Sequence, residues 1–169
     1  MDILIDLLLF TVLIISLFTD LKHRKIYNKV LFPALIIALL LQPMIYGMDG
    51  IKSSILGLLL GFGILLIPYL MGGMGAGDVK LLAVIGAITS PAFVFATAVY
   101  MAVLGGVIGL ALIIIRKDFF KRLYYALSNM RYGMQLLFPN KETMQRTFPY
   151  GVAIVGGACL SFFLDGVVI

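Results

Sequence analysis

Two aspartates, Asp20 and Asp78, stand at the edges of apolar runs in a chain that carries almost no other charge inside such runs. Ionisable side chains next to hydrocarbon are energetically expensive, and in membrane proteins they commonly mark functional sites. Two carboxylates that the fold brings together cannot both ionise cheaply, so the pair holds a shared proton. One carboxylate then activates water as a base, while the other protonates the peptide oxygen or the leaving amine. The pair therefore predicts peptide hydrolysis by an aspartic dyad.

Two other interpretations of these aspartates remain open. Each aspartate could instead cap a helix at the membrane interface, where a short acidic side chain accepts hydrogen bonds from free backbone N–H groups. Alternatively, the chain could be a small carrier or channel whose carboxylates relay protons or bind a cation. A relay of that kind places its carboxylates near the middle of the membrane, whereas Asp20 and Asp78 both fall at the ends of apolar runs.

The composition is that of an integral membrane protein, with 62% hydrophobic residues, 12% charged residues and a mean hydropathy of +1.12. A helix that spans a bilayer needs roughly 20 apolar residues. We therefore expect an all-α, polytopic protein whose single membrane-embedded domain fills residues 1–169. The first run is followed, not preceded, by basic residues, so we expect a transmembrane helix there and not a signal peptide. About six transmembrane helices are expected, at 3–19, 29–46, 51–70, 79–89, 92–115 and 148–168.

The lysines and arginines predict the orientation of these helices, because basic residues concentrate on the cytoplasmic side. With both termini outside, only Lys52 of the 13 basic residues falls outside. This topology, in the cell membrane, places Asp20 and Asp78 at the same cytoplasmic face. The basic segment 116–147 is then a cytoplasmic loop, partly amphipathic, that contacts anionic lipid headgroups or covers the active site. The net charge of +5 accordingly indicates membrane lipids as partners and not nucleic acid.

Other protease chemistries lack their residues. A zinc protease of the common type requires His-Glu-x-x-His, but the chain has one histidine, His23, and one glutamate, Glu142. No serine stands in a Gly-x-Ser-x-Gly elbow. A cysteine–histidine pair would need Cys159 and His23, which the predicted topology places toward opposite faces. The zinc, serine and cysteine mechanisms are therefore not expected.

Three local sequences carry a resemblance to a known family. Gly75-Ala76-Gly77-Asp78-Val79-Lys80 resembles the Gly-x-Gly-Asp signature of membrane aspartic proteases, in the form found in type IV prepilin peptidases. Asp20, followed by basic residues and Ile26-Tyr27-Asn28, is similar to the first motif of that family. Pro149-Tyr150-Gly151-Val152 is similar to its later Pro-Tyr-Gly-Pro element. Tyr27 and Val152 depart from the family, which often has proline at both positions. The motifs occur in family order.

The resemblance implies an endopeptidase that removes the short leader of prepilin-like substrates at the cytoplasmic face, with Asp20 and Asp78 as catalytic residues. The chain resembles the short, peptidase-only members, such as those that serve Flp/Tad pili or process archaeal preflagellins, and this resemblance implies no metal and no cofactor. The alternative is a non-catalytic pilus-assembly subunit or a small transporter, and the sequence does not indicate an oligomeric state. By the resemblance, an active-site loop contains Gly75, Ala76 and Gly77, in which the glycines permit a positive φ and close approach of the substrate backbone. Five further residues are expected to contact the substrate or to support the structure of the site, namely Lys80, Asn28, Pro149, Tyr150 and Gly151.

Overall fold

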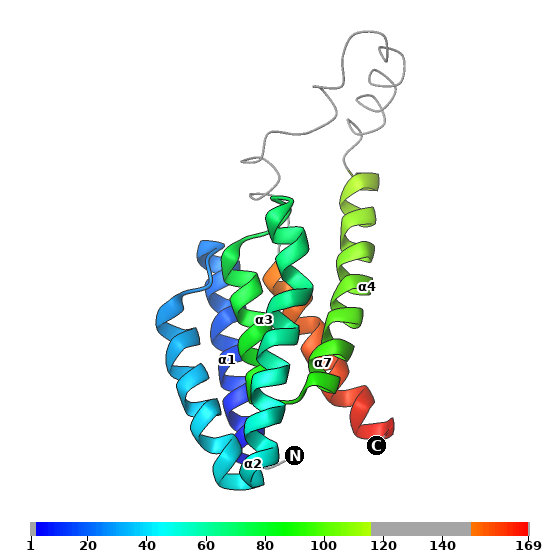
Figure 1. The fold of residues 1–169 in the computed structure, drawn as a ribbon. Coiled ribbons are helices and arrows are strands. Elements are labelled where there is room, and N and C mark those ends of the chain that lie inside the picture. The colour runs from blue at the N-terminus through cyan, green and yellow to red at the C-terminus, as the bar shows by residue number, and fades with distance from the viewer. Residues whose placement is uncertain (1–2, 116–149, 169) are drawn as a thin grey trace.

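The computed structural model describes residues 3–115 and 150–168, and this part of the chain consists of helices and short turns, without strands. The predicted all-α class is thus confirmed for the described residues, whereas the basic segment 116–147 and Pro149 lie outside them. Three helices are long and apolar enough to cross a membrane, namely α1, α2 and the first 21 residues of α4. The number of spans and their orientation stay predictions. The helices are α1 (Ile3–His23), α2 (Asn28–Leu70), α3 (Ala76–Ile88), α4 (Pro91–Ile115) and α7 (Tyr150–Val168) (Figure 1).

The chain reverses direction within α2, at Gly47 (Figure 1). Gly47 has a φ of 63° and a ψ of −140°, a backbone conformation that residues other than glycine rarely adopt. Pro43 precedes the reversal by one helical turn and removes one backbone hydrogen bond from the helix. The apolar runs predicted at 29–46 and 51–70 are therefore the two limbs of a helical hairpin, which we call the first and second limbs of α2.

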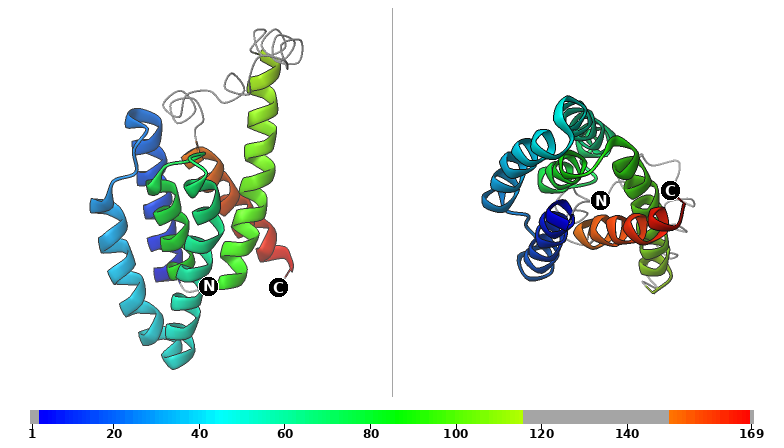
Figure 2. Two further views of the ribbon diagram at one scale, coloured as in Figure 1. Left: turned by 45° about the horizontal axis from the view of Figure 1, so that its top comes forward. Right: turned by 90° about the horizontal axis from the view of Figure 1, so that it is seen from below.

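Helix α3 is the central helix of the bundle. Val79 and every residue from Leu81 to Ile88 are buried, and α3 contacts each of the other four described helices (Figure 2). Its 13 residues span only about 20 Å at 1.5 Å per residue, less than the roughly 30 Å thickness of the hydrocarbon core. Because protein and not lipid surrounds α3, a short helix that is apolar on all sides is stable there.

Glycines allow α3 to pack closely on the second limb of α2. A methyl group on Gly57 would overlap the backbone carbonyl of Gly86, and one on Gly86 would overlap that of Gly57. Small residues of this kind let helices approach each other in lipid. The same limb satisfies a carbonyl at the end of α3, because the Ser54 hydroxyl donates to the carbonyl of Ala87 at 2.7 Å. The second limb of α2 thus fixes the position of α3.

We predict that Gly86→Ala destabilises the protein by about 1–3 kcal/mol, the usual cost of overpacking a well-packed interior. The added methyl overlaps the backbone of Gly57, so α2 and α3 must separate. Thermal unfolding of the purified protein in detergent, followed by circular dichroism, measures the effect. Gly63→Ala is the matched control, because open space surrounds the added methyl. Equal unfolding temperatures for the two variants would contradict the predicted packing.

Candidate active site

Asp20 lies in the last turn of α1, with its side chain directed against the start of α7. Helix α1 ends because Arg24 adopts a left-handed φ of 51° and its backbone N–H donates to the carbonyl of Asp20 at 2.8 Å. The Asp20 carboxylate packs so closely on Gly151 that a methyl group there would overlap it. The Asp20 Oδ2 atom is buried and makes no hydrogen bond of regular geometry within the described residues. The backbone N–H of Gly151 and the guanidinium of Arg24 are nevertheless close enough to act on its charge.

Asp78 is the third residue of α3 and is 9% exposed. The helix begins after Gly75, whose backbone is extended, and the Gly75 N–H donates to Asp78 Oδ2 at 3.2 Å. The partial positive charge of a helix amino terminus also favours a carboxylate at this position. Asp78 therefore caps α3 through one of its two oxygens, as expected if this aspartate serves as a helix cap. Capping does not account for Asp20, which lies at the carboxyl end of its own helix.

The two aspartates meet at one end of the bundle, where α1 ends and where α3 and α7 begin (Figure 1). The charge of Asp20 acts directly on the Asp78 carboxyl group. The charge of Asp78 in turn acts on the phenol of Tyr150, in the first turn of α7. Three segments that are far apart in the sequence, at 20, 75–80 and 150–151, therefore form one site.

Two further contacts join the segment between α1 and α2, together with the first residue of α2, to the start of α3. A methyl group on Gly77 would lie 3.1 Å from Cβ of Ile26, and Lys80 Nζ donates to Asn28 Oδ1 at 3.1 Å. Ile26 belongs to the first motif but was not among the expected site residues, because an apolar side chain carries no chemical signal. Ala76, the first residue of α3, is exposed.

The positive φ that was expected in the active-site loop occurs at a different glycine. Gly72 has a φ of 76°, whereas Gly75 is extended with a φ of −82° and Gly77 is already helical. The turn between α2 and α3 therefore takes its left-handed residue three positions earlier than predicted. The missing side chain of Gly77 instead permits the close contact with Ile26.

The surroundings of Asp78 hold its carboxyl group near the point of half-protonation at mildly acidic pH. Asp78 precedes the apolar run 79–89, and burial raises its pKa from 3.8 to about 6. The Gly75 N–H lowers this pKa and the charge of Asp20 raises it. A group that transfers protons works best with a pKa near the working pH. Asp78 is therefore suited to exchange a proton during a reaction.

We predict that Asp20→Asn lowers the pKa of Asp78 below its value of about 6 in the wild type. The substitution removes the negative charge that favours the protonated form of Asp78. The ¹³Cγ chemical shifts of labelled aspartates, followed against pH in detergent, measure this change, and Asp78→Asn identifies the resonance. Asp49→Asn should leave the titration unchanged, because Asp49 is 91% exposed and pairs with Lys52. An unchanged or raised pKa in Asp20→Asn would show that the two carboxylates are not coupled.

Comparison with known proteins is consistent with this geometry. A model of the type IV leader peptidase family matches residues 7–110, from α1 through most of α4. The matched stretch contains Asp20, the glycine loop and Asp78, and it covers more than half of the chain. No curated protein and no solved structure was found to match. The extent of the family match places this chain in the type IV leader peptidase family.

Proposed function

We propose that the protein is a membrane-embedded aspartic endopeptidase that removes the short leader of prepilin-like substrates, such as type IV pilins, Flp pilins or archaellins. Membership of the family implies a peptidase. The observation that supports the aspartic mechanism is that the end of α1 and the starts of α3 and α7 bring Asp20 and Asp78 together, close enough for the charge of Asp20 to raise the pKa of Asp78. A coupled pair of carboxylates, with Asp78 buried and Asp20 half-buried, is the kind of arrangement that acid–base hydrolysis uses.

In the proposed mechanism, the dyad holds one proton and a water molecule lies between the carboxylates and the scissile carbonyl. The ionised carboxylate takes a proton from the water as its oxygen attacks the carbonyl carbon. The protonated carboxyl group donates to the carbonyl oxygen, and the tetrahedral intermediate then collapses as the leaving amine takes up a proton. The titration belongs to the pair, so acid and base are not assigned to individual residues.

In this proposal, residues next to the dyad hold its two carboxylates in position. The Gly75 N–H holds one oxygen of Asp78, and the start of α7 holds Asp20 through Gly151. The hydrogen bond between Lys80 and Asn28 joins the start of α3 to the start of α2. These contacts position both carboxylates before a substrate arrives, which is the contribution that preorganisation makes to catalysis.

We place the dyad at the cytoplasmic face of the cell membrane. The basic residues Lys22, Arg24, Lys25 and Lys29 lie at or just after the end of α1, beside the dyad. Lys52, by contrast, follows the reversal of α2 at Gly47 and is 70% exposed. The bias of basic residues toward the cytoplasm therefore supports this orientation.

Cleavage in a purified system tests the proposal. The protein is reconstituted in liposomes with a prepilin-like protein, and the products are analysed by gel shift and amino-terminal sequencing. We expect a single cut immediately before the hydrophobic segment of the substrate. The absence of cleavage for a panel of pilin-, Flp- and archaellin-like substrates would contradict the proposal. Proton or cation flux in the same liposomes would then favour the transporter, although carboxylates at one end of the bundle are unusual for a midplane relay.

A further inference from the structure

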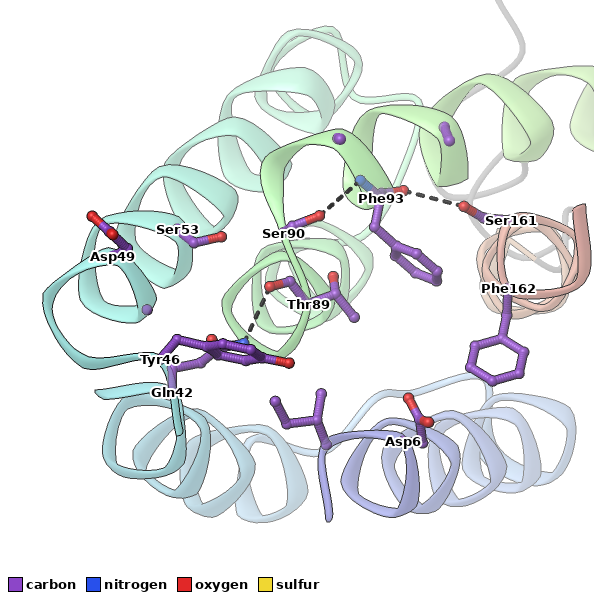
Figure 3. Close-up of a pocket in the computed structure, with 14 residues that line it drawn as sticks. Asp6, Gln42, Tyr46, Asp49, Ser53, Thr89, Ser90, Phe93, Ser161 and Phe162 are labelled. Atoms are coloured by element: carbon purple, nitrogen blue, oxygen red, sulfur yellow. Dashed lines mark hydrogen bonds between the residues drawn. The ribbon is translucent and has the colours of Figure 1, made fainter. Parts of the chain in front are cut away.

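A cavity of about 850 Å³ lies at the end of the bundle opposite the dyad (Figure 3). It forms where α1 begins, α2 reverses and α3 gives way to α4, and the middle of α7 closes one side. Asp6, on its wall, precedes Asp20 by about four helical turns, roughly 21 Å along α1. The volume is within the usual range of small-molecule sites, about 300–1,000 Å³. The cavity is therefore separate from the proposed active site.

Several polar side chains on the cavity wall already bind the backbone. Gln42 Nε2 donates to the carbonyls of Ile88 at 2.6 Å and Thr89 at 3.2 Å. The Thr89 hydroxyl donates to the carbonyl of Ile85 at 2.8 Å, and the Ser161 hydroxyl donates to that of Phe93 at 3.4 Å. These hydrogen bonds fix the wall of the cavity, and they occupy donor groups that could otherwise bind a ligand.

The Asp6 carboxylate differs from these side chains. Its Oδ1 atom is buried and has no hydrogen-bond partner in the part of the chain that the structure describes. In Figure 3 its carboxylate extends from α1 into the space that separates it from Phe93 and Phe162. A carboxylate in an apolar run with an unsatisfied oxygen is costly unless a partner neutralises it. The site therefore favours a positively charged ligand.

The aromatic residues on the wall restrict that ligand further. Phe162 is held by an edge-to-face contact with Phe10, with ring centroids 4.9 Å apart, and Phe93 is buried. Ring faces attract ammonium groups through their quadrupole and also accommodate an alkyl chain. Bare Ca²⁺ or Mg²⁺ would require several oxygen ligands, whereas among the described lining residues only Asp6 brings a carboxylate that is not engaged by Lys52.

We propose that this cavity binds an alkylammonium ion, with the ammonium group on Asp6 and the alkyl chain against Phe93 and Phe162. The ion belongs either to the headgroup of an aminophospholipid or to a soluble amine. Binding neutralises Asp6 and stabilises the folded bundle, and this stabilisation rises with the logarithm of ligand concentration once the site is saturated. The inference concerns a site that is independent of the proposed peptidase activity.

Binding of hexylammonium to the protein in phosphatidylglycerol nanodiscs tests the proposal, with 1-hexanol as the neutral analogue. We expect hexylammonium, and not hexanol, to raise the unfolding temperature and to give saturable binding by saturation-transfer NMR. Asp6→Asn should weaken hexylammonium at least tenfold. Asp49→Asn is the matched control and should change binding less than twofold, because that carboxylate is exposed and paired with Lys52. Gel filtration and circular dichroism check that each variant is folded.

A second variant keeps the test decisive should Asp6→Asn fail to fold. Phe162→Leu retains an apolar side chain but removes the ring against which the alkyl chain packs, so it should weaken hexylammonium binding severalfold. Equal binding of hexylammonium and hexanol by the wild type would overturn the proposal, as would unchanged hexylammonium binding in both variants. Phosphatidylethanolamine nanodiscs distinguish the two sources. Competition by this lipid identifies the headgroup as the ligand, and hexylammonium binding without competition identifies a soluble amine.

Discussion

Replacement of either Asp20 or Asp78 by asparagine is expected to reduce kcat for leader cleavage by about 10²–10⁴-fold, the usual contribution of a positioned acid–base group. Asparagine has nearly the same shape as aspartate but neither accepts nor donates the proton that the reaction transfers. The rate constant is measured with purified variants in liposomes and a prepilin-like substrate. Because the two carboxylates act as a pair, the double variant should be no slower than the slower single variant.

The control for these variants is Asp49→Asn, which removes the same charge from an exposed position at the other end of the bundle. It should cleave at the wild-type rate. Both dyad variants should still insert into the membrane and migrate as the wild type in gel filtration. Wild-type cleavage by Asp20→Asn or by Asp78→Asn would exclude the aspartic mechanism, whatever the substrate.

Gly151→Ala is expected to lower kcat by at least about 100-fold, although it changes no ionisable group. The added methyl overlaps the Asp20 carboxylate, so the side chain must move away from the start of α7. Misplacement of a reacting group by about 1 Å can cost 100-fold in rate. Displacement of Asp20 should also shift the titration of Asp78, because the charge of Asp20 contributes to its pKa. Cleavage kinetics and ¹³C titration of the same sample measure both effects.

Gly106→Ala in α4 is the matched control for this substitution, since no described atom lies within 4 Å of the added methyl. It should retain wild-type cleavage and the wild-type titration of Asp78. If Gly151→Ala is inactive but leaves that titration unchanged, its effect arises from general disruption and not from displacement of Asp20. Wild-type activity in Gly151→Ala would contradict the contact itself.

Much of the bundle is predictable from local patterns in the sequence. Apolar runs marked the helices, and the polar and glycine residues near Gly47 separated the two limbs of α2, because these properties depend on neighbouring residues alone. The short run 79–89 stood out by its length. Its role as the central helix could not be read from the sequence, because enclosure of α3 depends on contacts with four other helices. The pairing of Gly57 with Gly86 depends on the same tertiary arrangement.

The candidate site shows the same division. Asp20 and Asp78 were identifiable because a carboxylate beside an apolar run is chemically conspicuous. Ile26 was not identifiable, since only the folded chain reveals its contact with Gly77. The left-handed turn was assigned to the wrong glycines, because several glycines in succession offer equivalent positions for a positive φ. Asp6 was overlooked because a single acidic residue near the start of α1 has no sequence motif around it.

The contact between Asp20 and Gly151 has a consequence for the time at which activity arises during synthesis. Asp20 and Asp78 leave the ribosome early, but the surface against which Asp20 packs is translated more than 70 residues after Asp78. At about 5–20 residues per second, this interval lasts several seconds. A nascent chain therefore carries both carboxylates in the membrane before α7 can position the first of them. In the proposed peptidase, activity is therefore delayed until the last described helix has been made.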